Sequence, residues 1–527
     1  MTSQHAIRLI GLILLAWFSC CERGNQLIGE THPNIVLIFG DDMGLDCVSA
    51  FNDRLGLKTP HIDRLAGEGV SFMDAHSTSA VCSPSRYGLL TGRYNWRSRL
   101  KRGIVGQWER PLIEPNRLTL PEMLRQRGYH THMIGKWHLG FNWPSKNQKT
   151  GEPPTYTSKL AEIDFSGDIQ NGPNGRGFDY WFGDDVPNWP PYAWRENDKL
   201  LGTISTTAEK LKLTEYTGVN PGPAVAEWRL ESVLPEYGKR CAEFIHSQKD
   251  TEKPFFLYFP MPSPHSPIAP DQPWKGTSGV SEYADFLIET DAIVGQLLKA
   301  LDDSQQSKNT IVIFTTDNGT SPIAKFESLA EKGVHLTENF RGNKADAFEG
   351  GHRVPLVVRW PGVTQPNSRT NEVVSLVDIM ATLAQITNYD LPDEAAEDSM
   401  SLAPLLHGKR LEQPLHEAIV CHSISGHFAV RQGGENGQWK TLFCRGSGGW
   451  STPREAVAGK QNLPAVQLYD MRNDPKESVN LHLQHPEIVE KMTETLRRFI
   501  ENGRSTPGVP QANDQNSVHW PNVPWNK

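Results

Sequence analysis

The 527-residue sequence predicts an α/β fold: a mainly parallel central sheet between two layers of helices, then a smaller C-terminal α+β domain with an antiparallel sheet. Stretches with apolar residues at helical spacing, such as 119–127 and 281–303, alternate with short apolar runs. After residue 405 this alternation gives way to segments typical of antiparallel strands. The apolar runs end in or lead to polar residues, as is typical of buried parallel strands, and they cover residues 34–39, 131–135, 255–259 and 310–316.

The first 21 residues have the layout of a secretory signal peptide. Arg8 precedes the apolar run 9–18, which is too short to span a membrane. We therefore expect a secreted or periplasmic protein. Lipidation of Cys20 or Cys21 would instead give a membrane-anchored lipoprotein, and the sequence leaves both alternatives open.

A helix is expected just after Cys82. Ser83 is a good N-cap and Pro84 suits the first helical position, so we expect Cys82 just outside a helix end that attracts anions. Without the signal segment an odd number of cysteines remains, so at least one is unpaired or chemically altered. Cysteine counting alone favours a disulfide for Cys82. The pairing of the others is left open, and these cysteines are Cys47, Cys241, Cys421 and Cys444.

Charged and polar side chains follow each predicted strand. In open α/β sheets ligands bind beyond the carboxyl ends of the strands, so one site could collect these side chains. A turn would explain any single pair, but four strands that end this way predict a shared site. The residues are Asp41, Asp42, Lys136, His138, His265, Asp317 and Asn318.

The predicted site combines oxygen ligands with positive charge. Asp41, Asp42, Asp317 and Asn318 offer only oxygen atoms, which favours Ca²⁺, with Mg²⁺ as the less favoured alternative. A tetrahedral oxyanion is the expected ligand beside such a cation, because several basic residues accompany the acidic ones in a chain whose net charge is −8. These basic residues are Arg86, Lys136, His138, His265 and Lys344.

The remaining segments complete the domain plan. Residues 144–235 are rich in Pro, Gly, Trp and Asn and are expected to form long loops, where Asp184, Asp185 and the aromatic residues Trp189, Tyr192 and Trp194 could bind a sugar or simply pack. The net charge, without a basic tract, argues against nucleic acid as a partner. The predicted units are a large domain (30–405), an α+β domain (406–502) and an extended tail (503–527) that packs through Trp520 and Trp525.

The segment from Cys82 to Gly92 resembles the signature C-x-P-S-R-x4-T-G of type I sulfatases. Further segments match that family in its order, over about residues 33 to 362. The chain departs from the family at His61, where many relatives have Asn, and at 45–47, where an aromatic-containing stretch is more usual. The matching segments are DDMG (41–44), GKWHLG (135–140), PH (264–265), DNG (317–319), RGNK (341–344) and EGG (349–351).

This resemblance implies an alkaline-phosphatase-like α/β/α sandwich and a formylglycine-dependent mechanism. A maturation enzyme would oxidise Cys82 to formylglycine, whose hydrate attacks sulfur. The resemblance implies that His265 protonates the leaving alcohol, that His138 takes the proton of the second hydroxyl, and that Lys136 and Lys344 hold the sulfate. The implied catalytic set is Cys82, Arg86, Lys136, His138, His265 and Lys344, and the implied metal ligands are Asp41, Asp42, Asp317, Asn318 and Cys82.

Within the family, the motifs are most similar to the arylsulfatase A and N-acetylgalactosamine-6-sulfatase branch. The implied substrate is a sulfated polysaccharide or glycosaminoglycan fragment, such as one with 6-O-sulfated galactose or N-acetylgalactosamine. Two alternatives are a phosphatase or phosphonate hydrolase of the alkaline phosphatase superfamily, and a non-catalytic secreted carbohydrate-binding protein. Expected substrate contacts are Asp184, Asp185, His352, Arg353 and His422.

Overall fold

The computed structural model describes residues 32–149, 151–435, 437–514, 520, 523 and 525. The predicted signal peptide, with Cys20 and Cys21, lies outside these residues. From Asn34 onward, the described residues form one compact unit. The domain boundaries proposed from the sequence therefore stay predictions. Among the described helices, none combines the length and the apolar character that crossing a membrane requires.

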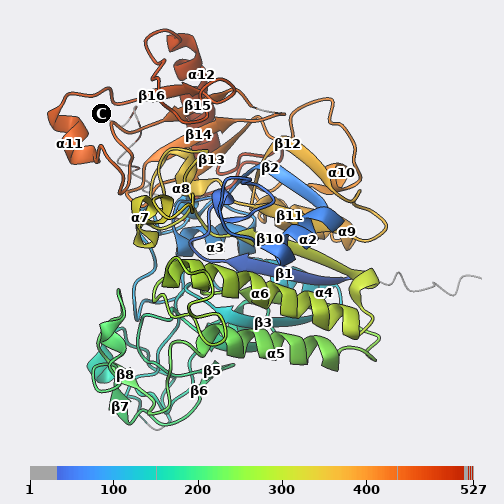
Figure 1. Cartoon of the computed structure of the whole chain (residues 1–527), viewed down its shortest axis with the longest axis vertical. Coiled ribbons are helices and arrows are strands. Elements are labelled where there is room, and N and C mark those ends of the chain that lie inside the picture. Colours follow the sequence, from blue (N-terminus) through green and yellow to red (C-terminus); the bar gives the residue numbers. More distant parts are fainter. Residues whose placement is uncertain are drawn as a thin grey trace, which may run out of the picture. The chain divides into compact units, whose positions relative to one another are not determined.

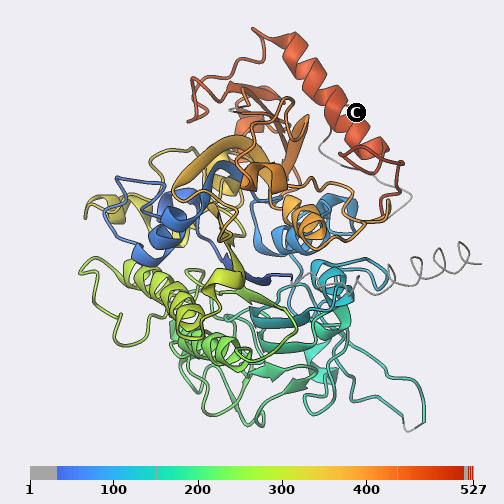
Figure 2. The same cartoon turned by 90° about the vertical axis from the view of Figure 1, so that its right-hand side faces the viewer.

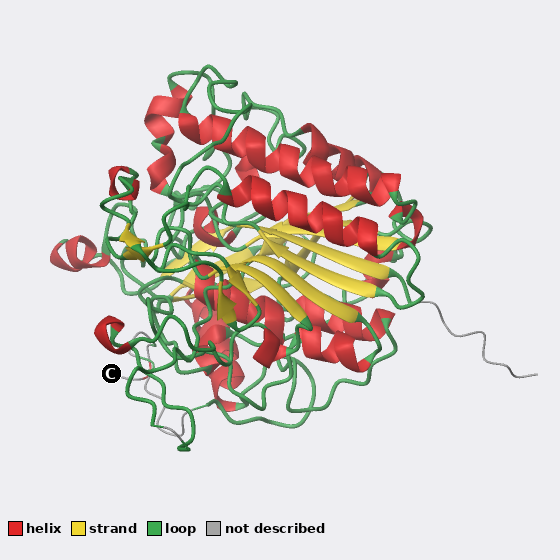
Figure 3. Ribbon diagram, turned by 90° about the horizontal axis from the view of Figure 1, so that it is seen from below, coloured by secondary structure: helices red, strands yellow, loops and turns green. Residues whose placement is uncertain are grey.

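A ten-stranded sheet forms the centre of this unit (Figures 1 and 3). The four predicted strands are confirmed as β10, β1, β9 and β3, which are neighbours and run parallel. Antiparallel pairing is confined to the strands on either side of this parallel block. The order is β12 (Ser368–Ser375), β2 (Val70–His76), β11 (Leu356–Arg359), β10 (Thr310–Thr316), β1 (Asn34–Gly40), β9 (Phe255–Pro260), β3 (His130–Lys136), β4 (Tyr180–Asp184), β5 (Arg195–Glu196) and β6 (Lys199–Leu200).

Helices cover both faces of this sheet, as Figure 3 shows. Successive residues of β1 point to opposite faces: Val36 and Ile38 pack with one helical layer, whereas Ile35 and Leu37 pack with the other. The predicted α/β/α sandwich is therefore confirmed. One layer contains α2 (Pro60–Glu68), α5 (Val233–Ser247) and α6 (Glu282–Asp303), and the other contains α3 (Cys82–Thr91), α4 (Leu120–Gln126) and α9 (Asp378–Ile386).

The segment 144–235 contains more regular structure than expected. Strand β4 lies within it, parallel to β3, so the prediction of loops alone is wrong at this point. Its sequence YWFGD is too aromatic and too short to show a strand period, and it is flanked by loop-forming residues. The short strands β7 (Thr206–Thr207) and β8 (Pro223–Ala224) also lie in this segment.

Four short helices lie further along the chain: α7 (Phe326–Ala330), α8 (Glu349–His352), α10 (Ala403–Leu406) and α11 (Glu455–Lys460).

The predicted antiparallel sheet near the C-terminus is confirmed, and Figure 2 shows a long helix beside it. One face of the sheet packs against this helix through Phe428 and Val430, and the other packs through Ile419 against residues that include Phe348 of the large domain. The Trp520 indole donates a hydrogen bond to the Trp96 carbonyl at 3.3 Å. The sheet consists of β13 (Ala418–His422), β14 (Phe428–Gln432), β15 (Trp439–Leu442) and β16 (Gln467–Asp470), and the helix is α12 (Pro486–Glu501).

Candidate active site

Two neighbouring strand ends bring the predicted acidic residues together. Asp41 and Asp42 directly follow β1, and Asp317 directly follows β10. The two strands end in register, because Gly40 pairs with Thr316 and the Asp317 amide donates to the Gly40 carbonyl at 3.1 Å. The parallel pairing therefore holds these carboxylates at one edge of the sheet.

Cys82 is the first residue of α3, rather than lying outside it as expected. Val81 takes the N-cap position in an extended conformation, and Ser83 does not cap the helix. The Ser83 hydroxyl instead accepts a hydrogen bond from the Val105 amide at 3.1 Å. Cys82 is 2% exposed, and its Sγ lies 3.7 Å from Oδ1 of Asp41.

The Cys82 thiol is free, so the disulfide favoured by cysteine counting is wrong. All five cysteines in the described residues are buried and unpaired. Burial would raise the pKa of the Cys82 thiol, but the ammonium groups of Lys136 and Lys344 lower it below its usual value. The surroundings of residue 82 therefore stabilise a negatively charged nucleophile or ligand at this position.

A buried guanidinium connects two of the strand ends. Nη2 of Arg86 donates to Oδ2 of Asp41 at 3.0 Å and to Oδ2 of Asp317 at 3.1 Å, and Nη1 donates to the Lys136 carbonyl at 3.2 Å. The Lys136 ammonium also pairs with Asp41. Although burial opposes it, Lys136, His265 and Arg86 hold the pKa of Asp41 well below its usual range. Asp41 is therefore a carboxylate between cations.

Asp42 connects a second group of candidate residues. Nζ of Lys344 lies 2.6 Å from its Oδ1, and Nε2 of His265 lies 3.8 Å from its Oδ2. Nδ2 of Asn318 donates to Oδ1 of Asp42 at 2.8 Å. The Asp42 backbone is left-handed, with φ of 59°, and its amide donates to Oδ1 of Asp317 at 3.0 Å. Because of this backbone turn, the side chains of the two successive aspartates, Asp41 and Asp42, point into the same site.

The oxygen atoms of this site fit a hard divalent cation. Oδ1 of Asn318 is buried and accepts no hydrogen bond. Burial and the neighbouring Asp41 raise the pKa of Asp317 well above its usual value. Three buried carboxylates beside an unused amide oxygen form a donor set typical of calcium or magnesium. The ligand atoms of Asp41, Asp42, Cys82 and His265 also lie within 4.8 Å of one another.

His138 presents a neutral imidazole. Its backbone is left-handed, with φ of 56°, and its amide donates to Oδ1 of Asp185 at 3.1 Å. Nε2 lies 3.2 Å from the Val105 carbonyl, which requires the hydrogen on Nε2, and the buried Nδ1 has no hydrogen-bond partner. Burial and Lys136 lower the pKa of His138 to about 3. Nδ1 therefore keeps a lone pair that can accept a proton.

The candidate residues of the expected sugar-binding loop are either buried or partly exposed. Asp184 ends β4 and is 3% exposed, and burial raises its pKa to about 6. Tyr192 is 1% exposed, and the Trp194 ring packs 5.1 Å from that of Phe182. Trp189 is partly exposed, and its ring meets the His138 ring edge-on at 5.1 Å. Trp189 is thus the aromatic residue of this group that borders the candidate base.

Three further predicted substrate contacts are not brought to the strand-end cluster. The His352 ring is buried against His76, with 2.9 Å between their Nδ1 atoms, and the Arg353 guanidinium pairs with Asp74 and with Glu349. The His422 side chain is 2% exposed, and burial lowers its pKa to about 3. The sequence did not predict that the Val105 carbonyl contacts His138, because a contact made by the backbone leaves no signal in the sequence.

Known proteins are similar to this chain in sequence and in fold. The Sulfatase family matches residues 33–389. A Bacteroides thetaiotaomicron protein named N-acetylgalactosamine-6-O-sulfatase is 33% identical over 93% of this chain and 97% of its own length, and mouse arylsulfatase G is 30% identical over 90% and 88%. A solved structure from B. thetaiotaomicron, described for metabolism of multiple glycosaminoglycans, is 31% identical over 89% of this chain and 99% of its own, with a TM-score of 0.75.

Proposed function

Because this chain belongs to the sulfatase family and is a sulfuric ester hydrolase, we propose that it removes sulfate from a carbohydrate by means of formylglycine and Ca²⁺. The resemblance to type I sulfatases of the N-acetylgalactosamine-6-sulfatase branch is confirmed by the family match and by the B. thetaiotaomicron N-acetylgalactosamine-6-O-sulfatase. The observation that carries the proposal is the convergence of Cys82 with acidic and basic side chains at three strand ends.

Residue 82 is proposed as the nucleophile after conversion of its thiol to formylglycine. The Cys82 thiol stands where the hydroxyl groups of the hydrated aldehyde would lie. That hydrate would supply one hydroxyl to attack sulfur and a second to release sulfate as the aldehyde re-forms. The lowered pKa of the thiol supports this assignment, because the ammonium groups that stabilise a thiolate would equally stabilise an alkoxide.

The proposed calcium ligands are Asp41, Asp42, Asp317, Asn318 and residue 82. The ion would supply positive charge that favours the nucleophilic alkoxide and the sulfate oxygens. The unpartnered Oδ1 of Asn318 supports an oxygen-liganded ion at this point. Arg86 would orient two of the carboxylates, since it bonds both Asp41 and Asp317.

The remaining side chains are assigned to proton transfer and to sulfate binding. His265 is 12% exposed and would donate a proton to the leaving alcohol. His138 would accept the proton of the second hydroxyl at Nδ1, whose lone pair is free. Lys136 and Lys344 would hold the sulfate oxygens through their ammonium groups.

We infer a 6-O-sulfated N-acetylgalactosamine or galactose as the substrate. The inference rests on the B. thetaiotaomicron N-acetylgalactosamine-6-O-sulfatase, which aligns over 93% of this chain. Trp189 is the proposed sugar contact, because its partly exposed ring borders His138. A formylglycine-generating enzyme is the partner that maturation would require, and the signal-like residues 1–21 support a secreted or periplasmic site of action.

Sulfate release from defined sugars tests this proposal. The matured protein should desulfate 6-O-sulfated N-acetylgalactosamine much faster than the 4-O-sulfated isomer, and Cys82→Ala should abolish release while Cys444→Ala, also buried, retains it. Equal rates on both isomers would contradict the proposed sugar. Faster release of phosphate than of sulfate from the 4-nitrophenyl esters would contradict the proposed reaction.

A further inference from the structure

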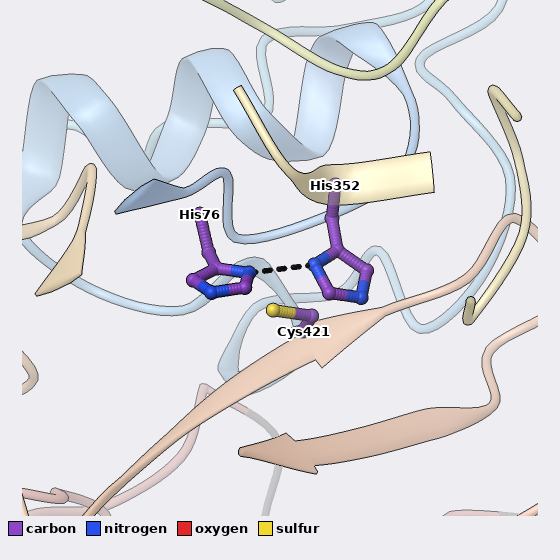
Figure 4. A group of neighbouring side chains, drawn as sticks. All are labelled: His76, His352 and Cys421. Atoms are coloured by element: carbon purple, nitrogen blue, oxygen red, sulfur yellow. Dashed lines mark hydrogen bonds between the residues drawn. The ribbon is translucent and has the colours of Figure 1, made fainter. Parts of the chain in front are cut away.

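A second cluster of potential metal ligands lies where the two sheets meet. His76 is the last residue of β2, His352 the last of α8, and Cys421 lies on β13 of the small sheet. All three are at most 1% exposed. Figure 4 shows the two imidazole rings facing each other beside the thiol. None of the three has a part in the proposed sulfatase mechanism.

The cluster has the dimensions of a metal site. Its three ligand atoms lie within 4.8 Å of one another, and the Nδ1 atoms of His76 and His352 are 2.9 Å apart. Burial lowers the pKa of both imidazoles, that of His352 with the help of Lys440. Both rings are therefore neutral, which is the form that binds a metal ion.

A carboxylate fixes the orientation of one ring. Nε2 of His76 lies 2.7 Å from Oδ1 of Asp74, so it carries the hydrogen and leaves the lone pair of Nδ1 directed at the cluster. A carboxylate that holds the outer nitrogen of an imidazole is a common second shell of zinc sites. Asp74 is itself held by Arg353 and Arg431.

Nε2 of His352, the ring nitrogen that points away from His76, has two neighbours. Each neighbour favours a different tautomer of the ring. Nε2 lies 3.2 Å from the Ala347 carbonyl and 3.1 Å from Nζ of Lys440. If Nε2 donates to Ala347, Lys440 can no longer donate to it and must turn to other partners. The two Nδ1 lone pairs then face each other across 2.9 Å, where a cation would join them. If Lys440 donates instead, His352 donates through Nδ1 to His76 and a hydrogen-bond chain runs from Lys440 to Asp74.

The charges around the cluster allow the first alternative. Lys440 pairs with Glu349 at 3.1 Å and with Glu477 at 2.8 Å, so two carboxylates surround its ammonium group. This ammonium group therefore has partners besides His352. An ion between the rings would then face a largely compensated lysine.

We propose that His76, His352 and Cys421 bind a thiophilic divalent cation such as Zn²⁺, which ties the small sheet to β2 and α8. Two imidazoles and a thiolate select zinc over the oxygen-bound cations, so this site differs in chemistry from the one at the strand ends. Binding uses the two Nδ1 lone pairs and the Cys421 sulfur. Burial raises the pKa of the Cys421 thiol, so the incoming ion must displace the thiol proton, which leaves to solvent. When His352 carries its hydrogen on Nδ1, that hydrogen moves to Nε2 and faces the Ala347 carbonyl.

Cobalt titration tests the proposal. Tag-free full-length protein carrying Cys82→Ser, with calcium in excess, is stripped of transition metal and titrated with Co²⁺, since a thiolate ligand produces an ultraviolet charge-transfer band. We expect one equivalent to bind with this band, and Zn²⁺ to displace it. Adding Cys421→Ser should remove the band, whereas the matched control Cys444→Ser, another buried thiol, should keep it.

X-ray absorption of the Zn²⁺-loaded Cys82→Ser protein gives a readout that does not depend on how the Cys421 variant folds. It should show one sulfur at about 2.3 Å and two nitrogens at about 2.0 Å. A zinc shell without sulfur, no charge-transfer band in the Cys82→Ser protein, or a band that survives Cys421→Ser would each overturn the site. The chain from Lys440 to Asp74 would then describe the cluster.

Discussion

At the scale of residues, the candidate active site depends on side chains whose contacts leave one functional atom free. Val105 and Asp185 hold His138, and Nδ1 remains available. The side-chain amide nitrogen of Asn318 donates hydrogen bonds to Asp42 and to the Gly319 carbonyl, and Oδ1 remains available. In both cases a buried atom without a partner marks the point where a ligand or a proton is expected.

Replacement of Arg86 by Lys should reduce sulfatase activity about 100-fold or more. A single ammonium group cannot bond Asp41, Asp317 and the Lys136 carbonyl in the geometry of the planar guanidinium. Initial rates on a sulfated sugar measure the effect. Arg64→Lys, which alters a surface ion pair with Glu68, should leave the rate unchanged, and equal rates for all three proteins would contradict the role of Arg86.

Acid should destabilise the protein partly through His422. Its folded pKa of about 3 lies below the value of about 6.5 for an exposed imidazole, so below pH 6.5 the unfolded chain binds a proton that the folded chain does not. The free energy of unfolding then falls as pH falls from 6.5 toward 3, by up to about 1.4 kcal/mol per pH unit. Urea unfolding at several pH values in this range measures the free energy of unfolding. Its dependence on pH should be shallower for His422→Gln, whereas replacement of the exposed His407 should leave the pH dependence unchanged.

At the scale of elements, the sequence predicts those strands whose apolar runs end abruptly in polar residues. β1, β3, β9 and β10 were predicted for this reason, and they carry the strand-end cluster. β4 was not, because five residues with three aromatic side chains show neither alternation nor an aliphatic run. His352 adjoins a matched motif, yet the short helix α8 directs its ring toward His76, which only the tertiary structure decides.

A glycine in the small domain should be required for the position of the Lys344 loop. A Cβ at Gly449 would lie 2.2 Å from the Ala345 carbonyl oxygen, so Gly449→Ala should push this loop away and lower activity at least about 10-fold. Gly459→Ala is the matched control, because nothing lies within 4 Å of its added Cβ. Sugar-sulfate hydrolysis and thermal unfolding measure both variants, and normal activity of Gly449→Ala would show that the contact is dispensable.

At the scale of the whole molecule, two sheets contribute to one catalytic region. The large sheet supplies the strand ends, and the small sheet supplies loops that pack on residues 343–347: the Ala347 amide donates to the Ser447 carbonyl at 2.7 Å, and the Ile424 amide donates to the Ala345 carbonyl at 3.1 Å. The Ala345 amide in turn donates to the Ala80 carbonyl, two residues before Cys82, at 2.7 Å. The C-terminal part of the chain thus supports the positions of both Cys82 and Lys344.

Calcium should stabilise the folded protein as a whole. An ion that binds only the folded state adds about 2.7 kcal/mol at 100 times its dissociation constant, so the melting temperature should rise with calcium and fall with a chelator. Asn318→Ala should reduce this shift, because it removes one oxygen ligand, whereas Asn473→Ala on the surface should not. A melting temperature that calcium leaves unchanged would contradict the proposed ion.

The dependence of sulfate release on the chemical state of residue 82 tests the central claim most directly. Preparations matured to different extents are compared by the mass of the peptide containing residue 82 and by their initial rate on a 6-O-sulfated sugar. We predict a rate proportional to the fraction of formylglycine and no turnover without it. Undiminished sulfate release by protein in which residue 82 is entirely cysteine would contradict the account.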